Sequence, residues 1–141
     1  MKRRTLLKAL AAGGVFPLAA SAAAPTPAGA WRDVLDTSAQ RSALAATGLL
    51  TGLARAGKRI VAVGQRGHVL LSDDAGKTWQ QADVPVSADL VAVCFADAAS
   101  GWAVGHDGVV LRSDDGGDSW QLQLDGRKAN ELLLAAMTRK V

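Results

Sequence analysis

The chain has 141 residues, of which 49% are hydrophobic and 21% are charged. This composition excludes a disordered tail and a coiled coil, and one cysteine with two histidines is too few for an internal disulfide or a structural zinc site. The formal net charge is +3, and the acid-free first 30 residues account for it, so the sequence predicts no nucleic-acid-binding surface.

Residues 1–30 have the three parts of an export signal: a charged start, an apolar stretch over residues 9–20, and small residues at a cleavage point. Arg3 and Arg4 begin the segment Arg-Arg-x-Leu-Leu-Lys, which resembles the twin-arginine export motif. Glycines and a proline interrupt the apolar stretch, and a membrane span needs about 20 unbroken apolar residues. We therefore expect export, with cleavage after Ala30 or Ala22 and no integral span in the mature chain. A general secretory signal is the alternative.

A lead-in over residues 31–47, predicted to form a short helix, precedes an internal repeat. Residues 62–80 align with residues 103–121 at a spacing of 41, and 12 of the 19 positions are identical. A repeat of about 40 residues built from short strands is typical of β-propeller blades. The sequence therefore predicts an all-β partial propeller of two four-stranded antiparallel blades, over residues 48–84 and 85–126, with short helices in the leader and in the tail.

Short apolar runs, many of them apolar on both faces, predict the individual strands. In the first blade the expected strands are 49–55, 59–64, 68–71 and 79–82, and in the second they are 90–96, 101–105, 109–112 and 120–124. Two glycine pairs, Gly64 with Gly67 and Gly105 with Gly108, are predicted to supply positive φ in the hairpin between the second and third strands of each blade.

Both units then carry an octapeptide of the pattern Ser-x-Asp-x-Gly-x-Thr/Ser-Trp. The Asp carboxylate is expected to accept backbone N–H groups of the turn, the Gly to take a conformation that a Cβ would obstruct, and the indole to lie beneath the turn. The positions are Ser72, Asp74, Gly76, Thr78 and Trp79 in the first unit, and Ser113, Asp115, Gly117, Ser119 and Trp120 in the second. We interpret these residues as structural. Catalytic carboxylates or a calcium site are the alternative, and the recurrence of the acids in both units argues against it.

Other reactive residue types do not form a recurring pattern. His68 and His106 stand 38 residues apart and so occupy different places in the repeat, and no metal site is predicted. Cys94 falls in an apolar strand and is predicted to be a core residue. Arg66 and Asp107 are expected at exposed hairpin tips, as solvated turn residues or as partner contacts.

The tail over residues 127–141 changes to helix formers, with an apolar stripe through Leu132, Leu133, Ala136 and Met137. We expect a helix that leads to a further blade or binds a partner. Four blades at this spacing need about 160 residues. The preferred interpretation is therefore the N-terminal part of a longer protein or a truncated reading frame, and the second is a ring assembled from several short chains.

The octapeptides resemble the Asp-box, also called the bacterial neuraminidase repeat. The second unit adds Gly101-Trp-Ala-Val-Gly105 and Gly108 ahead of its octapeptide, and this pattern resembles the photosystem II stability/assembly factor family of propellers over residues 46–124. The resemblance implies an exported, non-enzymatic scaffold without a cofactor, which binds a protein partner and aids the assembly or stability of a membrane-associated complex. The implied location is the periplasm, or the thylakoid lumen if the source is photosynthetic.

Asp-boxes also occur in sialidases, and a fragment of a sialidase-like glycosyl hydrolase is the alternative. Such an enzyme needs a Tyr nucleophile with a carboxylate partner and an arginine cluster. This chain has no Tyr, and its single Glu, Glu131, lies in the tail. The residues in hand therefore favour the scaffold.

Overall fold

Two antiparallel sheets follow each other along the chain in the computed structural model, which describes residues 29–140. The predicted export signal with Arg3 and Arg4 lies outside the described residues, apart from Gly29 and Ala30. Each sheet has four strands in simple sequence order, so the prediction of two four-stranded antiparallel blades is confirmed. The first sheet comprises β1 (Leu50–Ala56), β2 (Arg59–Gly64), β3 (Val69–Ser72) and β4 (Gln80–Gln81). The second comprises β5 (Leu90–Phe95), β6 (Gly101–Gly105), β7 (Val110–Ser113) and β8 (Gln121–Leu124).

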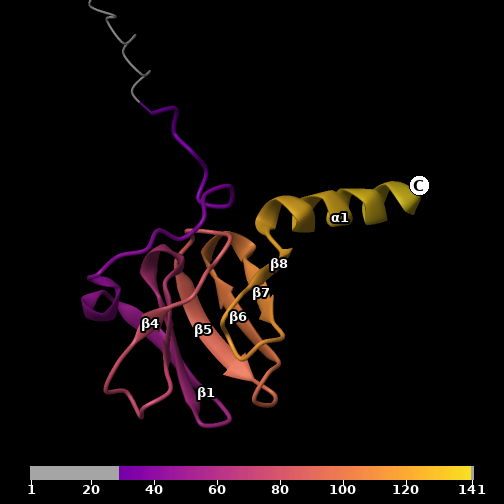
Figure 1. Cartoon of the computed structure of the whole chain (residues 1–141). Helices are drawn as coiled ribbons and strands as arrows, with labels where there is room; N and C mark the ends of the chain where they lie inside the picture. Colours follow the sequence, from indigo (N-terminus) through magenta and orange to yellow (C-terminus); the bar gives the residue numbers. More distant parts are fainter. Residues whose placement is uncertain (1–28, 141) are drawn as a thin grey trace, which may run out of the picture. The chain divides into compact units, whose positions relative to one another are not determined.

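The main core lies between the two sheets, where β1 runs beside β5 (Figure 1). Val61 and Val63 of β2 are fully buried there, and Ala103 and Leu111 of the second sheet are equally buried. The hydroxyl of Thr51 donates to the carbonyl of Leu90 at 2.5 Å and so joins the innermost strands of the two sheets. Strands that are apolar on both faces are expected in sheets that pack against a neighbouring sheet on each side. In this interface, one face of each sheet is packed in this way.

The lead-in contains one 3₁₀ turn, η1 (Ala45–Thr47), and no longer helix. Its backbone instead pairs with the connection between β4 and β5: the N–H of Ala39 donates to the carbonyl of Val84 at 3.0 Å, and the N–H of Ser87 to that of Val34 at 2.8 Å. Leu35 is buried in the main core. These tertiary bonds and this contact outweigh the helix propensity of the segment.

The hairpins after β2 and β6 are the short 3₁₀ turns η2 (Gln65–Gly67) and η3 (His106–Gly108). Positive φ falls on Arg66 and Asp107, at 57° and 56°, and on the glycine that follows each, as in type I′ turns. The first glycine of each predicted pair is extended instead. A Cβ on Gly64 would lie 2.1 Å from the carbonyl oxygen of Leu49, so close backbone approach, and not positive φ, requires glycine at this position.

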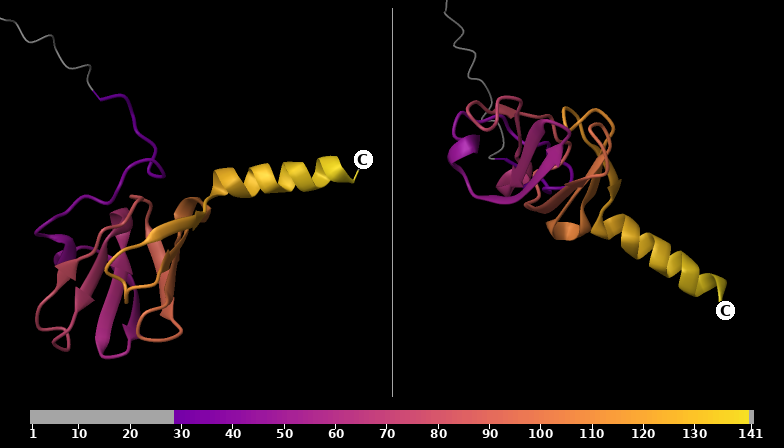
Figure 2. Two further views of the ribbon diagram at one scale, coloured as in Figure 1. Left: turned by 45° about the vertical axis from the view of Figure 1, so that its right-hand side comes forward. Right: turned by 90° about the horizontal axis from the view of Figure 1, so that it is seen from below.

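The tail forms helix α1 (Gly126–Arg139), which begins directly after β8 and leads away from the sheets (Figure 2). Asp125 caps its start, because the carboxylate accepts the N–H of Lys128 at 2.9 Å. Arg127 forms a two-bonded ion pair with Asp36 of the lead-in, at 3.0 Å for each bond. No residue of α1 is buried. Within residues 29–140, no helix combines the length and apolar character needed to cross a membrane.

Candidate functional site

The first octapeptide forms a corner between β3 and β4 that its own side chains close. Asp74 accepts the N–H of Thr78 at 2.8 Å on one carboxylate oxygen and the Thr78 hydroxyl at 2.5 Å on the other. Ser72 donates its hydroxyl to Asp74 at 2.9 Å and accepts the N–H of Gly76 at 2.8 Å. Gly76 has φ of +87°, a value that L side chains rarely adopt.

The second octapeptide repeats this network between β7 and β8. Asp115 accepts the N–H and the hydroxyl of Ser119 at 3.0 and 2.5 Å. Like Ser72, Ser113 donates its hydroxyl to the Asp and accepts the N–H of the turn glycine. The indole N–H of Trp120 donates to the carbonyl of Gly117 at 2.9 Å. The sequence pattern marked the two serines as structural without predicting their bonds, by which each serine links the Asp to the turn glycine.

These hydrogen bonds set the acidity of the octapeptide carboxylates. The Thr78 hydroxyl and N–H lower the pKa of Asp74 to about 2. For Asp115, burial alone raises the pKa, but the bonds from Ser119 and Ser113 together outweigh it and leave the pKa below its ordinary value. Both carboxylates are thus ionised and occupied by turn donors at neutral pH, which accounts for their spacing without a reaction or a metal.

Arg59 connects the two octapeptides, which the sequence pattern did not indicate. Its guanidinium donates to Asp73 at 2.7 and 3.0 Å and lies 2.9 Å from a carboxylate oxygen of Asp118 in the second octapeptide. Arg59 lies outside the segment of high repeat identity, so its place between two turns could be found only from the packing of the sheets.

The remaining chemically active residue types lie apart from one another. Cys94 is exposed on β5, so its prediction as a core residue is wrong: its side chain lies on the face of the second sheet that points away from the first. His68 is buried and His106 is exposed. Among residues 29–140, no group of three or more His, Cys, Asp or Glu side chains is arranged to hold a metal ion.

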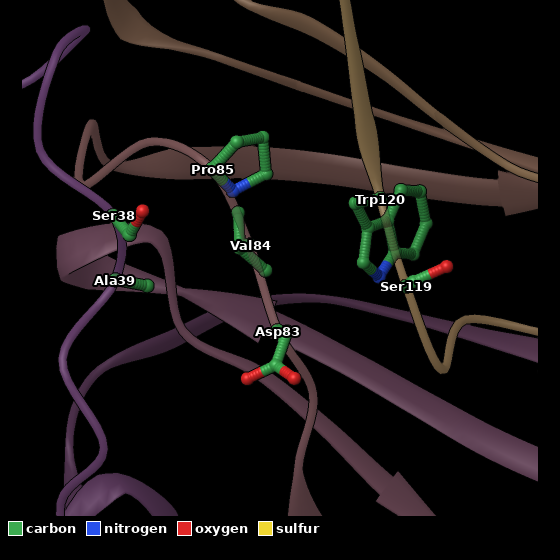
Figure 3. A pocket seen from close by; sticks show the side chains of 7 residues that line it. All are labelled: Ser38, Ala39, Asp83, Val84, Pro85, Ser119 and Trp120. Atoms are coloured by element: carbon green, nitrogen blue, oxygen red, sulfur yellow. The ribbon is translucent and has the colours of Figure 1, made fainter.

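A small cavity of about 320 Å³ lies beneath the second octapeptide. In Figure 3, Trp120 and Ser119 stand on one side, and the segment with Asp83, Val84 and Pro85 passes opposite them. The backbone of Asp83 forms an isolated parallel bridge with Ser119. Apolar side chains and the polar groups of Ser38, Asp83 and Ser119 both line this cavity, which lies against the packed indole of the corner.

A larger hollow, of about 430 Å³, lies between the lead-in and the hairpin after β2; we call it the lead-in groove. Most of its lining side chains carry hydrogen-bond donors. They are Thr37, Ser38, Gln40, Arg41, Ser42, Arg66, His68 and Ser87, with Val34 as the apolar member. The lead-in and the hairpin tip are thus joined at a surface that the repeat pattern alone did not predict.

Two arginines give the lead-in groove its charge. The guanidinium of Arg41 is held by Asp83 at 2.7 Å and by the carbonyl of Gln81 at 3.0 Å. The guanidinium of Arg66 has no ion pair within the described residues, while its backbone N–H donates to Asp89 at 2.7 Å and fixes the turn. A free guanidinium above hydroxyl and amide groups suits the carbonyl and carboxylate oxygens of a peptide.

Two consecutive meander sheets, each closed by an Asp-box corner and packed face to face, define a chain of the β-propeller class. In a comparison with family models, the chain matches "Photosynthesis system II assembly factor YCF48" in two overlapping stretches, residues 9–113 and 77–138. The chain belongs to this family, and the family resemblance seen in the sequence is confirmed.

A solved structure described as "YCF48 bound to D1 peptide" is similar to the chain with 25% sequence identity and a TM-score of 0.48. The similarity covers 54% of this chain and 26% of that one, so the chain spans about a quarter of the length of that protein. No curated protein matches the chain by sequence.

Proposed function

We propose that the chain is a binding scaffold that holds a protein partner and aids the assembly or stability of a membrane-associated complex. The observation that carries this proposal is the family match over residues 9–113 and 77–138, because the family is described by an assembly role. Binding rather than catalysis also agrees with the Asp-box carboxylates, which are fully engaged in closing turns.

The lead-in groove is the surface we propose for the partner. Arg66 presents a charged donor there, His68 lies beside it at the start of β3, and hydroxyl groups of the lead-in surround both. An extended peptide has carbonyl oxygens along its length and carboxylates at its acidic residues or C-terminus, and these are the groups that such donors bind.

We further propose that the protein acts after export to the periplasm, or to the thylakoid lumen of a photosynthetic source. The supporting pattern is the segment with Arg3 and Arg4 ahead of an interrupted apolar stretch. Replacing both arginines by lysine keeps the charge. It is expected to keep a reporter fused to the chain inside the cell if the route is twin-arginine export, and to leave export intact if the route is the general one.

We propose D1, whose peptide is named in the description of the similar solved structure, as the first partner to test. Overlapping synthetic peptides that cover the D1 protein provide the binding test. The full chain is titrated into each fluorescently labelled peptide, and anisotropy reports the affinity. At least one peptide is expected to bind, and Arg66→Asn is expected to weaken it about tenfold, the loss of one charge-assisted hydrogen bond. Asn tolerates the positive φ of this position, so the turn is kept.

Arg139→Asn, at the exposed end of α1, is the matched control and is expected to leave the affinity unchanged. Equal binding by Arg66→Asn and the unaltered chain would contradict the groove as the site but not the scaffold role. Failure of every peptide would contradict D1 as the partner, but not the scaffold role.

A further inference from the structure

Each sheet has one face in the main core and one face that no second sheet covers in the described residues. We call the open face of the second sheet the forward face; it is formed by Ala92, Cys94, Trp102, Val104 and Val110. The corresponding face of the first sheet is the rear face, formed by Leu53, Ala62, Leu70 and Trp79. Ala62 and Leu70 are buried in a small cluster with Ala45 of the lead-in, whereas Leu53 is exposed. Leu53 is 68% exposed and Val104 is 38% exposed, so both faces present apolar side chains to solvent.

The internal repeat makes these two faces counterparts of the interface already formed inside the chain. On the forward face, Val104 stands where the first sheet has the fully buried Val63. On the rear face, Ala62, Leu70 and Trp79 stand where the second sheet has Ala103, Leu111 and Trp120, all of which the main core buries. The forward face of one chain therefore corresponds to the first-sheet side of the internal interface, and the rear face of another chain corresponds to its second-sheet side.

We propose that the chain associates head to tail with further copies of itself, the forward face of one copy packing on the rear face of the next. Each contact repeats the packing of the first sheet on the second, so every added copy extends the array by two blades. Such a heterologous contact closes into a ring where the rotation allows and otherwise continues as an open array.

The close approach of the innermost strands requires a small adjustment in the contact between copies. Within the chain, Gly52 of β1 faces β5, where a Cβ on Gly52 would lie 3.3 Å from the Cα of Ala92. Gly52 and Ala92 also occupy the same register position of their sheets, opposite Val63 and Val104. Between copies, Ala92 of one chain would therefore meet Gly52 of the next. The Ala92 methyl group would then occupy the place that Gly52 leaves empty within the chain, so the two strands must lie a few tenths of an ångström further apart.

Charges at the edge of the faces are also complementary. Within the chain, Asp73 and Asp118 face each other and Arg59 bridges them. The repeat places Asp114 and Lys77 at these two positions of the contact between copies. A carboxylate and an ammonium group then meet directly, and no bridging arginine is needed.

Two other replacements make the contact between copies weaker than the one within the chain. Arg112 stands in place of the buried Leu71, although it is paired with Asp114 at 2.8 Å and lies 5.8 Å over the ring of Trp102. Arg55 stands in place of Phe95, the edge-to-face partner of Trp120. We therefore expect reversible association that depends on concentration.

Sedimentation velocity of the full chain over a range of concentrations tests the proposal. The unaltered chain is expected to form oligomers, whereas Leu53→Glu on the rear face and Val104→Glu on the forward face are each expected to stay monomeric. An equimolar mixture of these two variants is expected to form a one-to-one dimer, because each retains the face that the other has lost. Leu133→Glu on the exposed side of α1 is the control and is expected to assemble like the unaltered chain.

The exposed thiol of Cys94 gives a second measurement that does not depend on the size of the assembly. Iodoacetamide is expected to alkylate Cys94 slowly in the oligomer and at least tenfold faster in Leu53→Glu, although residue 53 lies on the opposite face. A chain that stays monomeric at all concentrations, or two folded variants that do not combine on mixing, would overturn the proposal. Circular dichroism of each variant checks that it is folded.

Discussion

The two Asp-box corners have nearly the same hydrogen bonds but very different surroundings. In each, the Asp accepts an N–H and a hydroxyl from the residue four positions on, at 2.8 and 2.5 Å in the first corner and 3.0 and 2.5 Å in the second. Trp120 of the second corner is 5% exposed in the main core, whereas Trp79 of the first packs only on a small satellite cluster. The octapeptide thus determines the shape of the corner, and the neighbouring sheet determines how much its indole stabilises.

The satellite cluster shows what the first corner has in place of a preceding sheet. Ala45 of the 3₁₀ turn packs with Ala62 and Leu70, and Trp79 lies partly buried against them. The lead-in therefore helps to bury Ala62 and Leu70 of the rear face and leaves Leu53 exposed. This incomplete cover distinguishes the first corner from the second more than any residue of the octapeptide does.

Removing each indole gives the largest expected effect and tests the comparison directly. Trp120→Ala is expected to lower the free energy of unfolding by about 3–5 kcal/mol, because a fully packed ring and its hydrogen bond to Gly117 are lost. Trp79→Ala is expected to cost about half as much. Urea unfolding of dilute, monomeric samples measures both, and equal losses would contradict the difference in packing.

The bridge between the corners comes next in size. Arg59→Met is expected to lower the free energy of unfolding by about 1–2 kcal/mol, because Asp73 and Asp118 would then face each other without a cation between them. The side chain of Arg59 is 22% exposed, but those of Asp73 and Asp118 are 68% and 59% exposed, so solvent screening keeps the loss at this modest size.

Arg112→Met is the matched control for this prediction. Arg112 pairs only with Asp114 of its own sheet and is half exposed, so its loss is expected to cost less than about 1 kcal/mol. If both variants lost the same stability, the arginine would contribute nothing as a link between the sheets.

The sequence predicted the local geometry of the corners and strands, but not the surroundings that distant segments provide. The period of 41 and the octapeptides predicted the two sheets, because the turn chemistry that starts and ends each strand is local and repeats. The strands of the structure begin and end within two residues of those expected. Both Asp-boxes adopt a geometry that their own side chains explain.

Features that depend on how distant segments meet could not be predicted. The apolar run around Cys94 indicated a core strand, but burial depends on a covering sheet, and none covers that face in the described residues. Arg41 and Arg66 both line the lead-in groove. The backbone pairing of Ala39 with Val84 holds the lead-in, which carries Arg41, against the connection between β4 and β5. Arg41 belongs to no motif, and the expected place of Arg66 at an exposed hairpin tip was the only sequence signal for this surface.

The acids of the two corners predict a loss of stability at low pH. The bonds from Thr78 lower the pKa of Asp74 to about 2, below its ordinary value of 3.8. A carboxyl group with a lowered folded-state pKa stabilises the fold above its unfolded pKa, and this contribution is lost as the pH falls from about 4 toward 2. The melting temperature is therefore expected to fall over that range.

Asp74→Asn and Asp115→Asn are each expected to melt at a lower temperature at neutral pH and to show a shallower fall on acidification. Asp107→Asn, at a hairpin tip without these bonds, serves as the control. A variant at either corner that keeps the full acid dependence of the unaltered chain would show that its carboxylate is not the titrating group.

The smallest expected effect concerns the residue before the octapeptide glycine, the one turn position with positive φ where the corners differ. Ala75 in the first corner has φ of 63°, and Gly116 in the second has φ of 71°. Ala75→Gly relieves the strain of a left-handed alanine, about 1 kcal/mol, and loses about half of this to the greater freedom of the unfolded chain. A net gain of about 0.5 kcal/mol is expected in urea unfolding.

The reverse change, Gly116→Ala, is expected to destabilise by more, because its Cβ would also lie 2.9 Å from the carbonyl oxygen of Ala98. Since the hydrogen bonds of the two corners match, equal and opposite effects would mean that only the backbone conformation matters here, and unequal ones would show that the loop before β6 constrains the second corner as well.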